Sequence, residues 1–407
     1  MSIGSAAAPS TTEAHRAVFV LALAQATAMI CNSIMIVTSG LTGQMLAEHK
    51  GWATVPLAFQ FIATMLTTFP ASFLMKRVGR KRGFMVGALI GIIGGLIMAA
   101  ATYMASFWLF AVGNTIFGVS AAFTLFYRFA AAEAADDAFR PKAISLVMAG
   151  GVVSALLGPY LARVGQELFT PHIFTGGFVF IVGLSILVVI MLLPLRLPQS
   201  AEGPAAVTDT EPARPLAEIV LQPRALSAII AAMLGYGVMS FVMTATPLAM
   251  TFCGFELKTG IAFVIQGHVL AMFAPSFVTG HIIKKVGEYR VMGAGVLCYV
   301  ATLAMGMAGV DIHHFWVALV FLGLGWNFLY VAGTSQLTKC YRRSERAKIQ
   351  AFNDCMVFSC VALCSFIAGT VEQAFGWDWV LRGAAVPIAL IAVALVIGWR
   401  RERAVAA

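Results

Sequence analysis

Charged residues are scarce in this chain. Only 11% of its 407 residues are Asp, Glu, Lys or Arg, whereas 60% are hydrophobic. A soluble domain carries about 25% charged residues, so this chain has too few to cover a surface that faces water. The composition excludes an ordinary soluble protein and predicts a protein that is surrounded by membrane lipid.

Motifs of metal sites and enzymes are also missing. None of the seven cysteines forms a CxxC pair or a zinc-like spacing. The sequence contains no HExxH, no paired Asp at a helix end and no Ser–Lys couple within an apolar run. We therefore expect no enzyme, no catalytic residue, no metal and no cofactor.

The net charge of +9 is not a nucleic-acid footprint. Its basic residues lie in short turns between apolar runs, where positive charge is typical of membrane topology signals. We expect no nucleic-acid partner.

Twelve apolar runs are long enough to cross a bilayer, for which a helix needs about 20 residues. They are 17–42, 53–75, 83–104, 107–129, 143–165, 173–195, 225–250, 261–283, 291–310, 315–338, 349–370 and 379–399. The predicted fold is an all-α membrane protein with twelve transmembrane helices. Its parts are an N-terminal tail (1–16), a six-helix bundle (17–195), a linker (196–224), a second six-helix bundle (225–399) and a C-terminal tail (400–407).

The connections between these runs carry charge asymmetrically. With twelve spans, all Lys and Arg residues except Lys50, Arg163, Lys258 and Arg382 fall on one side. Cytoplasmic loops carry an excess of Lys and Arg, so both termini and the linker are predicted to be cytoplasmic.

A basic turn is repeated about half a chain apart. Lys76-Arg77-Val78-Gly79 and Lys284-Lys285-Val286-Gly287 match in residue type, and Pro70 and Pro275 precede them. The repeat indicates two pseudo-symmetric halves, which are typical of secondary transporters. The paired prolines are expected to kink matched helices near the inner face.

The first turn resembles the G-x-L-x-D-R-x-G-R-K motif of the major facilitator superfamily (MFS). Leu74, Arg77, Gly79, Arg80 and Lys81 match, and the resemblance extends over nearly the whole chain. It implies two six-helix bundles that rock about a central site in a bacterial inner membrane, in a protein that we expect to be monomeric.

The chain departs from that family at one position linked to the latch and at one linked to proton coupling. Lys76 replaces the Asp that is thought to latch the two bundles, and Asn114 stands where many members have a proton-coupling Arg. Lys76, Arg77, Gly79 and Arg80 are candidates for gating. The alternative is that these cations only anchor the topology. Gly158-Pro159 is similar to the core of the family's exporter motif.

Polar residues within spans mark the candidate substrate site. Such residues are costly in lipid and usually face a cavity or a partner helix. The resemblance implies that spans 1, 4, 7 and 10 line the path. The candidates are Asn32, Asn114, Tyr236, Gln266, Trp326 and Asn327. Hydrogen bonding between helices is the alternative role.

Few titratable groups lie within the spans. Asp354 and His268 are candidate proton carriers, and Arg128 is a candidate coupling or gating residue. Asp354 could instead form an ion pair with Arg128 or a loop cation, and His268 could be a packing residue.

The predicted solute is small and neutral or weakly charged, because no fixed charge is evident at mid-membrane. Amides, hydroxyls and aromatic faces suit a planar, hydrogen-bonding molecule. We predict secondary transport by alternating access with protons as the candidate coupling ion, and a vitamin-like heterocycle such as riboflavin, taken up, as the solute. The alternatives are drug or metabolite efflux by proton antiport and a sensor that kept the transporter fold.

Overall fold

The computed structural model describes residues 11–136, 139–195, 197 and 214–406. Eleven of its helices are long and apolar enough to cross a membrane, and a twelfth span results if one bent pair is counted together. The described residues form helices without any strand. The prediction of an all-α fold with twelve spans is confirmed.

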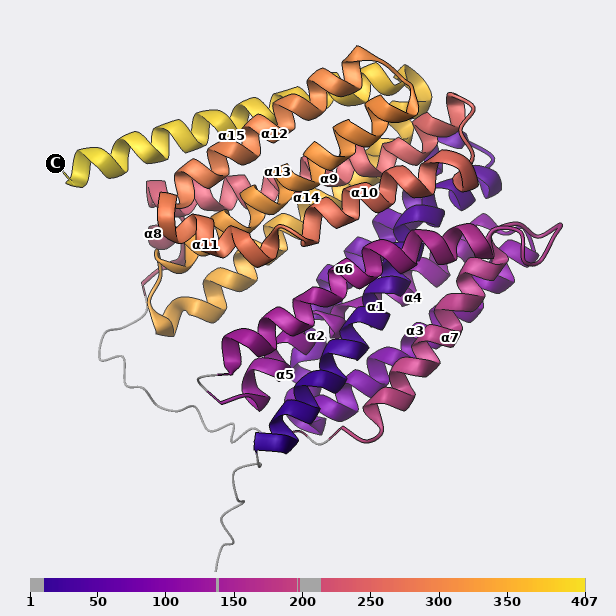
Figure 1. The fold of residues 1–407 in the computed structure, drawn as a ribbon, viewed down its shortest axis with the longest axis horizontal. Helices are drawn as coiled ribbons and strands as arrows, with labels where there is room; N and C mark the ends of the chain where they lie inside the picture. Colours follow the sequence, from indigo (N-terminus) through magenta and orange to yellow (C-terminus); the bar gives the residue numbers. More distant parts are fainter. Residues whose placement is uncertain (1–10, 137–138, 196, 198–213, 407) are drawn as a thin grey trace, which may run out of the picture.

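Six spans form the N-terminal half and six the C-terminal half (Figure 1). The first half consists of α1 (Thr11–Leu46), α2 (Val55–Val78), α3 (Arg80–Tyr103), α4 (Phe107–Thr124) with α5 (Tyr127–Ala134), α6 (Arg140–Gly165) and α7 (Thr175–Leu192). The second consists of α9 (Pro223–Phe252), α10 (Ala262–Phe273) with α11 (Ser276–Val286), α12 (Glu288–Ala308), α13 (Ile312–Thr338), α14 (Arg346–Phe375) and α15 (Trp377–Ala406). Short helical segments are η1 (Lys50–Trp52), α8 (Leu216–Val220), η2 (Leu257–Ile261) and η3 (Arg343–Glu345).

The helices extend beyond the predicted spans at both ends of the chain. α1 begins at Thr11, inside the predicted tail 1–16, and α15 continues to Ala406 through the predicted tail 400–407. Most of the predicted linker 196–224 lies outside the described residues. Its end is described and contains α8, whose Ile219 is buried against the C-terminal half.

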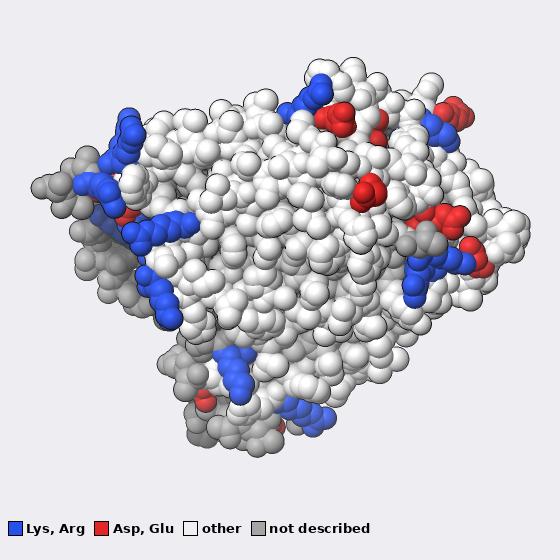
Figure 2. Space-filling model, turned by 45° about the horizontal axis from the view of Figure 1, so that its top comes forward, with Lys and Arg blue, Asp and Glu red and all other residues white. Residues whose placement is uncertain are grey.

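The surface of the molecule fits a hydrocarbon environment. On the face shown in Figure 2, charged side chains lie toward the margins and a broad uncharged surface separates them. Many large apolar side chains are exposed there and elsewhere, including Phe73, Leu297 and Leu390. Helices that are apolar on all sides are typical of membrane spans, because lipid replaces the protein core around them.

The two halves meet at the end away from the chain termini (Figure 1). There the Thr370 hydroxyl donates to the Gly51 carbonyl at 3.0 Å, and the Gly369 amide donates to the Thr54 hydroxyl at 3.1 Å. An ion pair between Glu167 and Lys258 also joins the halves. These contacts close the molecule at this end, which we call the far end; the end that carries the basic turns is the basic end.

The two basic turns have the same backbone conformation. Gly79 has φ +86° and Gly287 has φ +85°, a region that favours glycine. Each amide ends its helix by donating at 2.9 Å, Gly79 to the Met75 carbonyl and Gly287 to the Ile283 carbonyl. The sequence repeat is therefore also a structural one.

Pro70 and Pro275 lie in different backbone settings. α2 passes through Pro70 as one helix. In contrast, Pro275 lies in the break between α10 and α11, which are bent by 43° relative to each other. Proline removes one backbone hydrogen bond in both cases, and only the second helix breaks.

Candidate functional site

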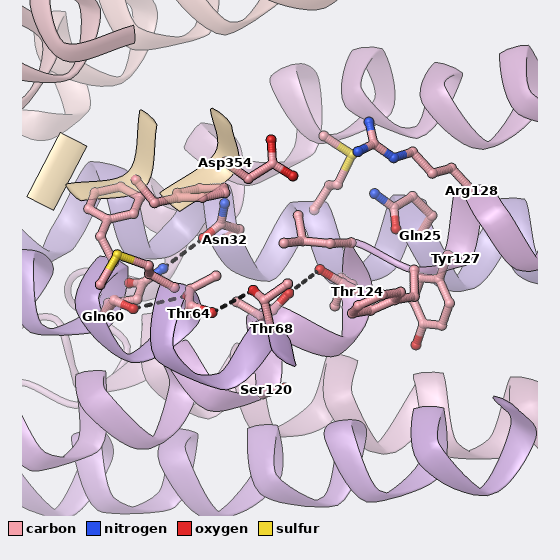
Figure 3. Close-up of a pocket in the computed structure, with 18 of the residues that line it drawn as sticks. Gln25, Asn32, Gln60, Thr64, Thr68, Ser120, Thr124, Tyr127, Arg128 and Asp354 are labelled. Carbon is pink, nitrogen blue, oxygen red and sulfur yellow. Dashed lines mark hydrogen bonds between the residues drawn. The ribbon is translucent and has the colours of Figure 1, made fainter. Parts of the chain in front are cut away.

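A cavity of about 660 Å³ lies between the two halves (Figure 3). It extends from Asn32 and Gln60 within the bundles to Arg128 and Gln350 at the basic end. Five of the predicted residues line it, namely Asn32, Tyr236, Trp326, Asp354 and Arg128. The volume is in the range of small-molecule sites.

The N-terminal half contributes most of the neutral polar groups of the cavity. The Gln60 amide donates to Asn32 Oδ1 at 2.8 Å, which leaves Gln60 Oε1 without a hydrogen-bond partner among the described residues. Gln25 Oε1 is a second buried acceptor without a described partner. Such groups are costly to bury and are ready to accept hydrogen bonds from a solute.

Hydroxyl groups follow α2 along the cavity at intervals of one helical turn. Thr64 donates to the Gln60 carbonyl at 2.9 Å and Thr68 to the Thr64 carbonyl at 2.8 Å (Figure 3). Ser72 continues this row. Each hydroxyl oxygen keeps lone pairs that can accept from a solute. We call Gln60, Thr64, Thr68 and Ser72 the polar row.

The C-terminal half contributes a cluster of aromatic rings. Trp326 and Tyr330 are stacked, with ring centroids 5.3 Å apart and planes 9° apart. Tyr236 lies edge-on to both rings, at 5.2 and 5.4 Å. Phe273 lies 5.9 Å from Trp326. We call Tyr236, Phe273, Trp326 and Tyr330 the aromatic cluster; it offers apolar ring faces to the cavity.

One cation and one anion line the cavity, and they do not form the predicted ion pair. Among the described residues, no nitrogen of Arg128 lies within 4.0 Å of an Asp354 carboxylate oxygen. The Arg128 guanidinium lies 4.8 Å from the centroid of the Phe129 ring, and its buried Nε has no described partner. Asp354 accepts from the Asn353 amide at 3.3 Å. Both charged groups are therefore available to a solute.

Asn114 and Asn327 lie outside the cavity and are fully buried. Asn114 accepts from the Ser39 hydroxyl at 3.0 Å and donates to the Phe110 carbonyl at 2.9 Å. It ties α4 to α1. The position of Asn114 therefore fits hydrogen bonding between helices, which was the alternative to a role in solute binding.

Asn327 holds the bend between α10 and α11. Its amide donates to the Met272 carbonyl at 2.7 Å and the Ser276 hydroxyl at 2.6 Å, and its oxygen accepts from Thr279 at 2.7 Å. These bonds satisfy polar groups on both sides of the break that contains Pro275.

Gln266 and His268 also lie outside the cavity lining. Gln266 is half-buried on α10. His268 is fully buried, and its Nδ1 lies 2.8 Å from the Leu319 carbonyl oxygen. This placement fits a packing histidine better than a proton relay along the cavity.

The gating candidates of the first basic turn make no described contact with the other half. Lys76 and Arg77 are exposed at the end of α2, and Gly79 ends that helix. Arg80 forms a two-point ion pair with Glu133 of α5, within the same half. With Lys76 in place of the latch Asp, no described ion pair crosses between the halves at this end.

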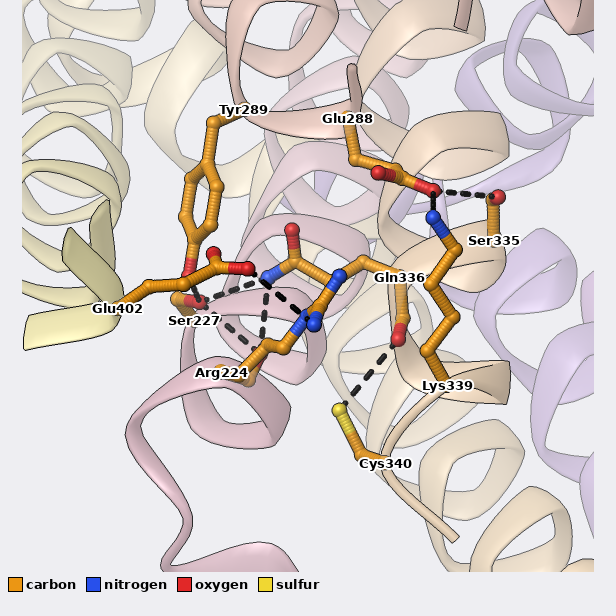
Figure 4. A network of polar contacts seen from close by, with 9 residues as sticks. All are labelled: Arg224, Ser227, Glu288, Tyr289, Ser335, Gln336, Lys339, Cys340 and Glu402. Carbon is orange, nitrogen blue, oxygen red and sulfur yellow. Dashed lines mark hydrogen bonds and ion pairs between the residues drawn. The ribbon is translucent and has the colours of Figure 1, made fainter. Parts of the chain in front are cut away.

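The corresponding end of the C-terminal half is held by a denser polar network (Figure 4). Arg224 of α9 pairs with Glu402 of α15 at 3.2 Å. Lys339, which directly follows α13, pairs with Glu288 of α12. The Gln336 amide donates to the Arg224 carbonyl at 2.9 Å and the Ser227 hydroxyl at 3.1 Å.

The buried carboxylate of Glu345 holds the end of the linker, at Arg214, against the C-terminal half. Glu345 is fully buried and accepts from Arg214 Nε at 2.9 Å and from the second guanidinium nitrogen at 2.8 Å. These bonds hold the pKa of the Glu345 carboxyl well below its usual range, and Glu345 raises the pKa of Arg214.

Sequence reasoning missed most of the polar row and half of the aromatic cluster. Both have a signal at helical spacing: the members of the polar row recur every four residues, as do Trp326 and Tyr330.

Gly158, interpreted as an exporter hint, lies against Ser33, where an added Cβ would come within 2.3 Å of the Ser33 side chain. It permits close packing of α6 on α1.

Comparisons with known proteins agree with this architecture. The family model described as the Major Facilitator Superfamily matches residues 17–275 and 258–407. The riboflavin transporter RfnT of Brucella anthropi is 37% identical over 395 residues, covering 97% of this chain and 98% of that protein. The uncharacterized MFS-type transporter YdeG of Bacillus subtilis is 25% identical over 403 residues, covering 95% and 92%.

Solved structures show the same fold. The POT family transporter PepTSo gives a TM-score of 0.73 at 11% identity and covers 96% of this chain and 98% of that one. The nucleoside transporter NupG gives 0.70 at 15% identity and covers 94% and 99%. With two six-span halves around a central cavity and a family match along its length, the chain belongs to the major facilitator superfamily and is a multi-pass membrane transporter.

Proposed function

We propose that this transporter takes up riboflavin. The observation that carries the proposal is that one cavity presents both the polar row and the aromatic cluster. Riboflavin combines a planar aromatic ring system with a chain of hydroxyl groups, so the ring system suits the aromatic cluster and the hydroxyl chain suits the polar row. The similarity to RfnT along the whole chain supports the same solute.

The charges of the cavity also suit this solute. Arg128 and Asp354 balance one another, so a neutral molecule needs no further countercharge. The ring system of riboflavin would stack against Trp326 and Tyr330, and its hydroxyl chain would replace water at Gln25, Asn32 and Gln60.

The orientation that we propose places the basic end in the cytoplasm of a bacterial cell, across the inner membrane. The positive charge at that end supports it. The cavity then faces inward, and the contacts of Gly51 and Thr54 with α14 close the outer side. Uptake requires the two halves to rock so that these contacts open and the basic end closes, in alternating access by a monomer.

Asp354 is the proposed proton carrier, since it lines the cavity without a cationic partner within 4.0 Å. Proton binding would change the balance between Asp354 and Arg128. The test is uptake into proteoliposomes with and without a proton gradient, with Asp354→Asn beside the wild type. Uptake that is unaffected by collapse of the gradient would leave facilitated diffusion and remove this role.

The substrate proposal is tested by uptake of labelled riboflavin in cells that cannot make it. We expect accumulation with the wild type and at least about a fivefold lower apparent affinity for Trp326→Leu, because base-sized rings gain about 1–3 kcal/mol from aromatic stacking. The control is Trp108→Leu, since Trp108 is exposed on α4, outside the cavity. Normal uptake by Trp326→Leu, or lowered cellular riboflavin with the wild type, would contradict the proposal; the second result would indicate efflux.

A further inference from the structure

A second hollow of about 430 Å³ lies on the side of the C-terminal half, away from the central cavity. Residues of α9, α14 and α15 line it, and none of them carries a charge. α14 and α15 each pack closely on α9 and touch one another little. The hollow is therefore a groove between α14 and α15, with α9 as its floor.

Small residues create this groove. A Cβ at Gly237 of α9 would lie 2.5 Å from the sulfur of Cys360, so the glycine lets α9 approach α14 closely. On α15, a Cβ at Gly383 would lie 3.6 Å from Phe241, an ordinary contact. A larger side chain at Gly383 would thus extend into the groove without displacing the backbone.

The groove runs along one half of the membrane. On α14 its lining extends from Cys360 to Phe375, a rise of about 22 Å at about 1.5 Å per residue. Half of the hydrocarbon core is about 15 Å thick. The groove is therefore long enough to cross one leaflet, and its exposed end residues Phe375 and Trp379 lie at the far end of the molecule.

A cation without a carboxylate partner stands at that end. The Arg382 guanidinium lies 5.3 Å from the centroid of the Trp379 ring, one of the groove residues. None of the described carboxylates, including Asp378 one turn earlier on α15, lies within 4.0 Å of it. An arginine at the level of the headgroups binds phosphate oxygens well, because its planar donors match them.

We propose that the groove is a binding site for one phospholipid of the leaflet at the far end. An acyl chain fills the space between α14 and α15, and the phosphate binds Arg382. The apolar lining, the length of one leaflet and the single cation at the headgroup end all fit this molecule. The site is independent of the transported solute.

The bound lipid would contact the outer side of helices that form the central cavity. α9 carries Tyr236 toward the cavity and Gly237 toward the groove, and α14 carries Phe358 and Cys360 in the same way. The acyl chain therefore supports the packing of the two helices that open and close around the solute.

The test is native mass spectrometry of the full-length protein in detergent, titrated with phosphatidylglycerol. We expect the wild type to retain one lipid beyond a weak background, and Gly383→Leu to bind it at least tenfold more weakly, because the leucine occupies the groove. The matched control is Gly293→Leu on α12, where an added Cβ meets no atom within 4 Å. This control should bind lipid as the wild type does.

A second pair of variants tests the headgroup contact and does not alter the packing. Arg382→Gln should weaken binding several-fold, whereas Arg163→Gln should not, although Arg163 also lies over a ring, 5.4 Å from the Tyr160 centroid. If the intensities of the wild-type peaks decrease evenly with the number of bound lipids, the protein binds annular lipid only, and the proposal is overturned. So would unchanged binding by both Gly383→Leu and Arg382→Gln. Riboflavin is absent from these measurements, so their outcome does not depend on the proposed substrate.

Discussion

The two halves of this transporter share one helical plan, and both bring aromatic side chains to the cavity, but most of its neutral polar groups come from one half and its stacked pair of rings from the other. The N-terminal half contributes the polar row, Asn32 and Gln25, and the C-terminal half contributes the aromatic cluster. The halves also differ in mechanics: span 4 is interrupted between α4 and α5, whereas span 8 is broken between α10 and α11. The repeated basic turns thus occur in halves whose side chains differ around the cavity.

We expect the largest difference between the halves in the stability that each loses when a buried asparagine is replaced. Asn327→Leu leaves the Met272 carbonyl and the Ser276 hydroxyl without their partner, so we expect a loss of about 3 kcal/mol, at about 1–3 kcal/mol per unsatisfied group. Asn114→Leu removes one partner of Ser39 and should cost about half as much. Thermal unfolding of both variants in one detergent measures the difference, and equal losses would show that the bend needs no such support.

The separate roles of the polar row and the aromatic cluster can be tested with a shortened solute, which is the flavin ring system with a methyl group in place of its hydroxyl chain. Gln60→Leu should weaken riboflavin about tenfold and leave this analogue nearly unchanged, because a lost hydrogen-bond network costs about 1–2 kcal/mol. Tyr330→Leu should weaken both. Competition against labelled riboflavin uptake gives the affinities. If Gln60→Leu weakens both molecules equally, the polar row does not recognise the chain.

The charged groups at the basic end should give the halves different responses to pH. The lowered pKa of Glu345 means that this carboxyl stabilises the folded protein above its unfolded pKa of about 4.3 and loses that effect as the pH falls toward the folded value. Glu345→Gln should therefore be less stable than the wild type at pH 7, with the difference shrinking below about pH 4.5. Unfolding midpoints between pH 7 and pH 3.5 test this. Glu133→Gln in the N-terminal half serves as the control, and a gap of constant size would refute the ion pair's role.

The smallest effect is expected for Arg80→Gln. Its ion pair with Glu133 is solvent-exposed on the acidic side, and such pairs contribute about 0–1 kcal/mol. Unfolding temperature should change little and uptake should remain. A loss of uptake at unchanged stability would instead indicate a gating role for this turn.

The sequence predicted the fold well because the length of an apolar run determines whether it spans the bilayer. The orientation of individual side chains was harder to predict. Asn32 and Asn114 are both amides in apolar helices, and only the first lines the cavity, since a helix that is apolar all round does not mark its inner face. Pro70 and Pro275 show the same limit: their sequence settings match, and the helix breaks only where Asn327 supports the freed groups.

The polar row has a consequence for the speed of release. Its members Gln60, Thr64, Thr68 and Ser72 succeed one another at single helical turns from the centre of the cavity to its mouth. A solute that moves along α2 can exchange one hydroxyl partner for the next before it loses the first. Release toward the mouth of the cavity can therefore proceed in several small steps, so that recognition at the aromatic cluster need not make release slow.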